Sequence, residues 1–221
     1  MERTMTDEGA RRLRGRAPLP VDPQKPIAVK RDVHELVVDV EAARFAAAFR
    51  DVVTDPESTF GLIRVKRPAE RMGRDFAVGE RFQGCFSLEL AAGRRLPWLA
   101  RLLAKRGPQK LVTWIEDQML SNYAEVVSIE ARPGDVHVLV YRYLEGTPIA
   151  GSSEFVIEPA GPGRCRVRQI FEYQEVNALA LGTFQSIGLK WHDGVVKMEI
   201  EKAAARAGGR VIEDTIPESY R

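Results

Sequence analysis

Hydrophobic and polar residues alternate along four successive runs in the second half of the chain. These runs cover residues 124–131, 136–144, 151–157 and 164–176, and each has the period of two that is typical of a strand with one buried face. Short segments rich in glycine and proline separate them. This spacing predicts an antiparallel meander whose apolar face needs a cover.

The pattern then changes to steps of three and four, which predicts a long amphipathic helix over residues 183–207. A single stripe of that helix carries Phe184, Ile187, Trp191, Val195 and Met198. The helix is long enough to cover the apolar face of the meander, so we expect it to close the sheet.

The first half of the chain predicts fewer elements. We expect a strand at residues 34–40, a helix at 41–53 and a second clear strand at 77–90, followed by helical segments within residues 91–120. The predicted fold class is therefore α+β. It is a curved antiparallel sheet wrapped around a long C-terminal helix, with a helical insertion after the second strand.

This order of elements resembles the START, polyketide-cyclase and pollen-allergen superfamily (SRPBCC), whose fold is the helix grip. Local features that match lie at residues 54–57, 78–82, 151–159 and 191–195. The resemblance covers about residues 33–207 and implies a hydrophobic cavity that holds a lipid, a polyketide or an isoprenoid-like molecule. The group has no universal catalytic residue to carry over, and the insertion at 91–120 replaces its usual tight turn.

Domain boundaries follow from the same patterns. Residues 1–26 are basic and interrupted by four prolines, so we expect a disordered tail. Residues 27–207 form a single helix-grip domain, in which residues 91–120 are an insertion or lid. Residues 208–221 are expected to be a C-terminal tail.

Composition narrows the class of protein. A net charge of +2 over 221 residues gives no reason to expect nucleic acid as a partner. The two cysteines, Cys85 and Cys165, lie in strand-like runs and are expected to be inert buried thiols. No signal-peptide or membrane-length apolar run is visible, which favours a cytoplasmic protein, and the abundance of arginine and alanine is bacterial in style.

Inward-facing positions of the strands and the closing helix make the candidate ligand site. If the charged faces of the strands point to water, a set of aromatic and polar side chains turns inward. From the strands this set is Phe86, Tyr141, Tyr143, Phe155, Gln169, Phe171 and Tyr173, and from the helix Ile187, Trp191 and Val195. The alternative is that these tyrosines fill a solid core and bond to one another.

Candidate catalytic residues are scarce. His192 on the closing helix, or His137 on a strand, could act as a base, with Tyr141 or Tyr143 polarising a carbonyl. Asp193 has Lys190 and Lys197 at helical spacing, so we expect a solvated ion pair there. The histidines show no metal-ligand spacing, and we expect neither a metal nor a cofactor.

Three functions remain open on this basis. The first is a carrier or sensor that binds a hydrophobic small molecule in the cavity. The second is a cyclase or dehydratase acting on a polyketide-like substrate in the same cavity, and the third is a module whose groove receives a peptide. The segment from Leu96 to Arg106 has leucines and Trp98 on one side and basic residues on the other. This pattern fits either peripheral membrane contact or a lid helix that packs on its own domain with a basic outer face, and the two are compatible if the lid opens at a membrane.

Overall fold

The fold is described from a computed structural model, which covers residues 5, 7–54, 63–86, 106–108, 110–112, 121–177 and 189–216. For residues 63, 64, 86, 190 and 191 the description is of the backbone alone. Eight antiparallel strands form one sheet in the order β2-β3-β4-β5-β6-β7-β1-β8. Their bounds are β1 Lys30–Val38, β2 Ile63–Lys66, β3 Arg81–Phe86, β4 Ser121–Arg132, β5 Val136–Tyr143, β6 Ile149–Pro159, β7 Cys165–Glu175 and β8 Val211–Asp214.

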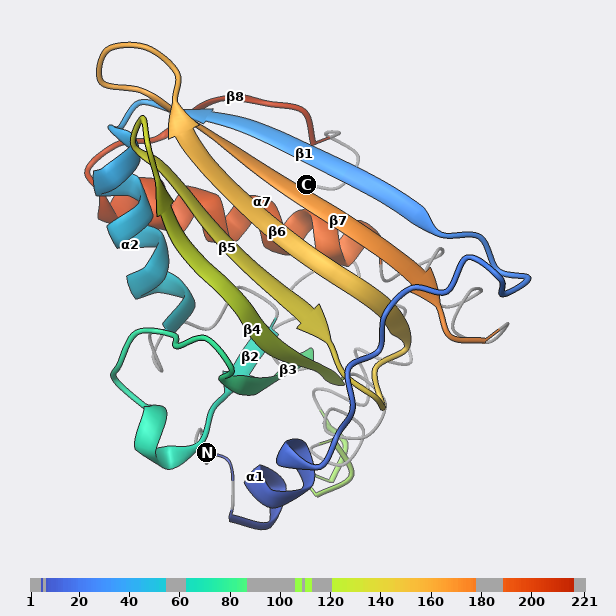
Figure 1. The fold of residues 1–221 in the computed structure, drawn as a ribbon. Coiled ribbons are helices and arrows are strands. Elements are labelled where there is room, and N and C mark those ends of the chain that lie inside the picture. The colour runs from blue at the N-terminus through green and yellow to red at the C-terminus, as the bar shows by residue number, and fades with distance from the viewer. Residues whose placement is uncertain are drawn as a thin grey trace.

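Helices lie on one face and at the ends of this sheet. They are α1 Asp7–Arg14, α2 Ala42–Thr54, the short 3-10 helix η1 Ala69–Arg71, and α7 Leu189–Arg206. Helix α7 runs across one face of the curved sheet, and α2 lies at one end of it (Figure 1). Between the sheet and these two helices lies the main hydrophobic core, which includes Leu36, Phe45, Phe49, Val167 and Ile200.

The α+β helix-grip prediction is confirmed. The four strands of the meander and the helix after the first strand all form close to their predicted positions. Gly151 shows how β6 and β7 approach: its φ is 120°, and a Cβ built there would lie 2.0 Å from the carbonyl oxygen of Glu172. Only glycine fits this conformation and this contact.

The buried stripe of α7 differs from the predicted one. Val195 is buried as expected, but Met198 is only half-buried. Val196, Ile200 and Ala203 are buried instead and belong to the core that includes α2. The prediction assumed that the sheet alone would contact the helix, whereas α2 packs on it as well. Phe184 and Ile187 lie outside the described residues.

The two predicted tails are wrong where the structure describes them. Residues 7–14 form α1, and Met5, Ala10 and Leu13 pack on Leu144. The chain after α1 also hydrogen-bonds to the sheet, for example from Leu19 N to the carbonyl of Tyr143 at 2.9 Å. At the other end, β8 pairs with β1. Period and composition missed both segments because they are short, and their stability comes from docking on the rest of the molecule.

Most of the insertion at 91–120 lies outside the described residues. Residues 110–112 are helical and Val112 is buried. Cys85 and Cys165 are both buried thiols that form no disulfide with each other, as predicted. None of the helices in the described part of the chain has the length and the apolar character needed to cross a membrane.

Candidate functional site

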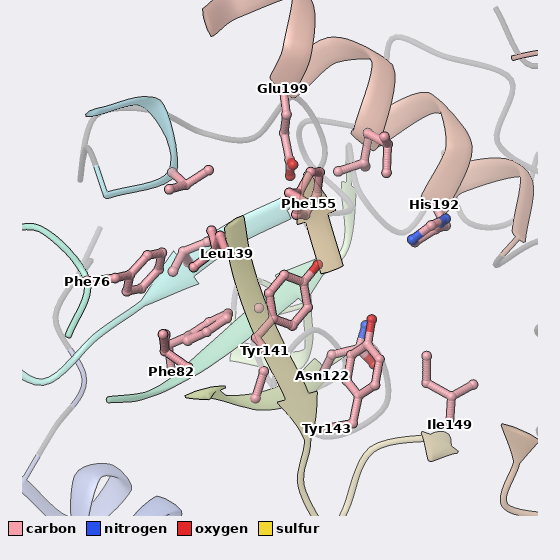
Figure 2. A pocket seen from close by; sticks show the side chains of 17 residues that line it. Phe76, Phe82, Asn122, Leu139, Tyr141, Tyr143, Ile149, Phe155, His192 and Glu199 are labelled. Carbon is pink, nitrogen blue, oxygen red and sulfur yellow. The ribbon is translucent and has the colours of Figure 1, made fainter. Parts of the chain in front are cut away.

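A cavity of about 110 Å³ lies between α7 and the inner face of the sheet. Its walls are mainly aliphatic and aromatic, and the polar groups come from a few side chains (Figure 2). The described lining residues are Val53, Val65, Phe76, Phe82, Gly84, Asn122, Ala124, Val126, Leu139, Tyr141, Tyr143, Ile149, Phe155, His192, Val195, Val196 and Glu199.

Small residues on the inner strands leave this space open. Ala124 on β4 pairs with Phe82 of β3 on one side and with Tyr143 of β5 on the other. In the same way Gly84 of β3 pairs with Asn122 of β4. Large rings therefore flank positions that have almost no side chain, and the volume between them stays unfilled.

Among the described lining residues, Glu199 is the acidic side chain. It projects from α7 toward Phe155 and Tyr141 (Figure 2). Burial raises the pKa of Glu199 to about 8, and the charge of Lys202 opposes this only partly. The carboxyl group is therefore mainly protonated at neutral pH, so it can donate as well as accept a hydrogen bond.

Two tyrosines face Glu199 from β5. Burial raises the pKa of both Tyr141 and Tyr143, and the nearby charge of Glu199 adds to the effect. Both phenols therefore keep their protons at neutral pH. Their rings meet edge to face with centroids 6.0 Å apart, which fixes the two hydroxyl groups on one wall of the cavity.

His192 is held in the cavity wall by a buried polar cluster. Its Nδ1 lies 3.4 Å from Oδ1 of Asp193, and its Nε2 lies 3.3 Å from Nε2 of Gln169. The ring stacks on Phe171 with centroids 4.2 Å apart. Burial lowers the pKa of His192, partly offset by the hydrogen bond with Asp193, so the ring is neutral at neutral pH.

Asp193 corrects the prediction of a solvated ion pair. It is 2% exposed, and its Oδ1 also lies 3.0 Å from Nε2 of His34 on β1. Burial alone would raise the pKa of Asp193, but the hydrogen bonds from His192 and His34 bring it below its ordinary value. Lys197 pairs with Asp214 instead. Helical spacing predicted that Asp193 faces solvent, but the side of α7 that carries it contacts His34 of β1.

Three predicted ligand-binding residues belong to the packed interior and not to the described cavity lining. Phe171 and Tyr173 stack on each other with centroids 4.5 Å apart and pack with Tyr143 and Ile149. Gln169 is fully buried and donates a 2.7 Å hydrogen bond to Ser153. For these residues of β7, the alternative that the aromatic side chains fill a solid core therefore applies.

His137 lies apart from the other candidate catalytic residues. Its Nε2 is 2.8 Å from Oδ1 of Asp135, in the turn before β5. It does share a strand face with Tyr141, but four residues along a strand span about 13 Å. His137 instead borders a small crevice beside Phe49 of α2.

Tyr141, Tyr143, Phe155, His192 and Val195 are the predicted site residues that the structure brings together around the cavity. Ile187 and the side chains of Phe86 and Trp191 lie outside the described residues. Neither Glu199 nor His34 was among the predicted site residues. A carboxylate among the apolar residues of the closing helix was the available signal for Glu199.

This arrangement is the helix grip, the fold that the sequence predicted. Neither a protein-family model nor a curated protein matches the chain by sequence. Solved structures do match by fold. A point mutant of norcoclaurine synthase from Thalictrum flavum, in complex with a transition-state analogue, has a TM-score of 0.53 at 11% identity and covers 84% of this chain and 99% of its own.

Two further structures give similar values. The Thalictrum flavum synthase in complex with dopamine and hydroxybenzaldehyde has a TM-score of 0.50 at 10% identity, covering 81% of this chain and 86% of its own. A hypothetical protein from Helicobacter pylori has a TM-score of 0.51 at 12% identity, covering 84% and 90%. At these identities the likeness establishes the fold alone.

Proposed function

We propose that the protein binds a small hydrophobic molecule with one or two polar atoms between α7 and the sheet, as a carrier or sensor. The cavity itself is the observation that carries this proposal. Its volume of about 110 Å³ is of the same order as the roughly 150 Å³ engineered cavity that binds benzene. A guest of about one ring fits without rearrangement, whereas a longer lipid, polyketide or isoprenoid requires the cavity to widen.

The polar side chains of the cavity wall indicate which polar groups the guest should have. Glu199 and the hydroxyl groups of Tyr141 and Tyr143 face the same space, among apolar neighbours (Figure 2). Tyr141 and Tyr143 hydrogen-bond to each other, and Tyr141 also to Ser153. A hydrogen bond contributes about 0.5–1.5 kcal/mol, so a guest whose hydroxyl or carbonyl oxygen joins this group gains affinity over a pure hydrocarbon. The norcoclaurine synthase complex with dopamine and hydroxybenzaldehyde supports guests of this size in this fold.

The test is a calorimetric titration of 4-ethylphenol and ethylbenzene into the full chain. Both should bind saturably, and 4-ethylphenol should bind more tightly. Ala124→Leu fills the space between Phe82 and Tyr143 and should weaken both affinities at least tenfold. Val127→Leu is the matched control, because Val127 lies on the same strand but is 41% exposed. Equal affinities in the two variants would place the binding elsewhere.

A second candidate is the cyclase or dehydratase. The observation that favours it is the placement of His192, a neutral imidazole in the cavity wall whose ring is fixed by Asp193 and Gln169. His192 would take a proton from a carbon next to a carbonyl, while Tyr141 donates a hydrogen bond to the carbonyl oxygen. With a poly-β-keto thioester as substrate, His192→Ala should abolish turnover and leave affinity unchanged. Turnover that survives this change would remove the assignment.

Uptake from a membrane is a further part of the carrier proposal, and it rests on the sequence from Leu96 to Arg106 alone. Its leucines and basic residues have the pattern of an interfacial helix. The chain should sediment with anionic vesicles, and the double change Leu99→Asp with Leu103→Asp should abolish this. Sedimentation of the double variant would contradict the proposed contact.

A further inference from the structure

Three side chains of metal-binding type meet behind the cavity wall. They are His34 of β1 and the neighbouring His192 and Asp193 of α7, and their donor atoms all lie within 4.8 Å of one another. His34 is 4% exposed and Asp193 is 2% exposed. The sheet therefore brings residues from opposite ends of the chain into one buried cluster.

The two distances from Asp193 to the histidines fit a coordination sphere. Oδ1 of Asp193 lies 3.0 Å from Nε2 of His34 and 3.4 Å from Nδ1 of His192. Nitrogen and oxygen ligands at about 2.0–2.2 Å from Zn²⁺ are separated by about 3.0–3.4 Å in octahedral or tetrahedral geometry. Two imidazoles and one carboxylate are also a common donor set for first-row divalent ions, and they leave positions open for water.

Charge in the cluster favours a cation. The buried carboxylate of Asp193 is hydrogen-bonded to His34 and His192, and a cation would compensate its charge more fully. Oδ2 of Asp32 lies 3.7 Å from Nε2 of His34 and adds a second negative group. Among the described residues no lysine or arginine pairs with Asp193, since Lys197 pairs with Asp214 and Lys30 with Glu175.

Gln169 lies beside His192 in this cluster. Its Nε2 faces Nε2 of His192 at 3.3 Å, while its Oε1 is buried and has no partner among the described residues. Because the two ends of an amide are assigned from their bonding, the reverse orientation is equally compatible with the shape of the side chain. Oε1 then accepts a bond from Nε2–H of His192, and Nδ1 turns its lone pair toward Asp193.

That orientation needs a cation between two electron-rich atoms, Nδ1 of His192 and Oδ1 of Asp193. A hydrogen bond from the far nitrogen of the ring to an oxygen acceptor is the usual way in which proteins orient a metal-binding histidine. In the reversed amide Oε1 also accepts a hydrogen bond from Oγ of Ser153, and Nε2 takes the buried position that has no partner among the described residues. The reversal therefore prepares His192 as a ligand without adding to the hydrogen bonds of Gln169.

We propose that His34, His192 and Asp193 bind a divalent first-row transition-metal ion at the edge of the cavity, with Gln169 orienting His192. This site does not depend on a guest in the cavity. It also excludes the base role of His192, because a metal-bound imidazole nitrogen has no free lone pair for a proton.

The experiment uses the full chain without an affinity tag, stripped of metal and titrated with ZnCl₂ and CoCl₂. We expect one Zn²⁺ per chain with Kd of about 1 μM or tighter, and visible absorption bands from protein-bound Co²⁺. His34→Ala should weaken Zn²⁺ binding at least about 100-fold. His137→Ala is the matched control, because His137 forms the other histidine–aspartate pair, with Asp135. It should bind Zn²⁺ as the wild type does.

A second measurement needs no variant, in case His34→Ala does not fold. Zn²⁺ at 100 times its Kd should raise the Tm of the wild-type chain by about 5 °C or more. Absence of stoichiometric binding to the wild type would overturn the site. So would a folded His34→Ala variant with unchanged affinity, because the ion would then lie elsewhere.

Discussion

At the scale of single residues, the most informative group is the carboxyl of Glu199. It projects from a helix into an apolar cavity, where water cannot fully solvate a charge. The groups that face it are the phenols of Tyr141 and Tyr143 from the sheet and the ammonium of Lys202 from its own helix. Of these only Lys202 favours the ionised form, and the pKa of Glu199 stays raised.

This shift makes stability depend on pH in a defined direction. The pKa of Glu199 is about 8 in the folded chain against an ordinary 4.5, so the folded state holds a proton that the unfolded state releases. Stability should therefore fall as pH rises from about 5 to about 8, by at most about 1.4 kcal/mol per pH unit. Glu199→Gln cannot ionise and should lack this fall.

The measurement is urea unfolding of both chains at pH 5.5 and 8.5. The free energy of unfolding of Glu199→Gln relative to the wild type should rise by about 1–3 kcal/mol between the lower and the higher pH. Glu201→Gln is the control, because Glu201 lies on the same helix but is exposed. If the wild type and Glu199→Gln respond equally to pH, the carboxyl is not buried as described.

The candidate site was only partly predictable at this scale. Alternation along β5 identified Tyr141 and Tyr143, since strand geometry fixes which side chains share a face. Alternation along β6 and β7 did not show that Phe155 lines the cavity while Phe171 packs in the core. That difference depends on which side chains lie opposite each ring. The cluster of His34 with His192 and Asp193 depends on β1 docking beside α7, which no local spacing encodes.

At the scale of elements, the docking of α1 is the feature that amino-acid composition did not predict. Its arginines and the following prolines suggested disorder, yet Leu13 is 2% exposed and packs on Leu144. Arg81 of β3 donates hydrogen bonds to the carbonyl oxygens of Leu13, Arg14 and Arg16, which caps the end of the helix. A buried leucine and a capping arginine thus contribute to the docking of this segment.

Truncation of that leucine measures the docking directly. Leu13→Ala should lower the free energy of unfolding by about 2–4 kcal/mol, as expected for a leucine buried in a core. Leu111→Ala is the matched control, because Leu111 is 43% exposed, and it should change stability by less than about 0.5 kcal/mol. Urea unfolding of both variants checks this, and a Leu13→Ala chain as stable as the control would mean that α1 is undocked.

The elements that sequence predicted well are those with long, regular patterns. The strands of the meander from β4 to β7 are eight to twelve residues long and contain the alternating runs. Helix α2 has an apolar face along its whole length. Short elements such as β8 and η1 carry too few residues for any period. Their positions follow from pairing and packing with distant segments, as in the bonding of β8 to β1.

At the scale of the whole molecule, a curved sheet and a helix across it leave space that their side chains do not fill. Gly84 of β3 and Ala124 of β4 have little or no side chain, and Phe82, Tyr143 and Phe155 surround the space that this leaves. The proposed binding function and the placement of Glu199 both depend on this space.

Xenon is the most direct probe of it, because dry apolar cavities bind this atom without any polar contact. Crystals of the wild-type chain under xenon pressure should show an anomalous scattering peak between α7 and β5, in contact with Leu139, Phe155 and Val195. Ala124→Leu should reduce its occupancy. A wild-type crystal with no xenon at this position, and with side chains packed through the space, would contradict the account.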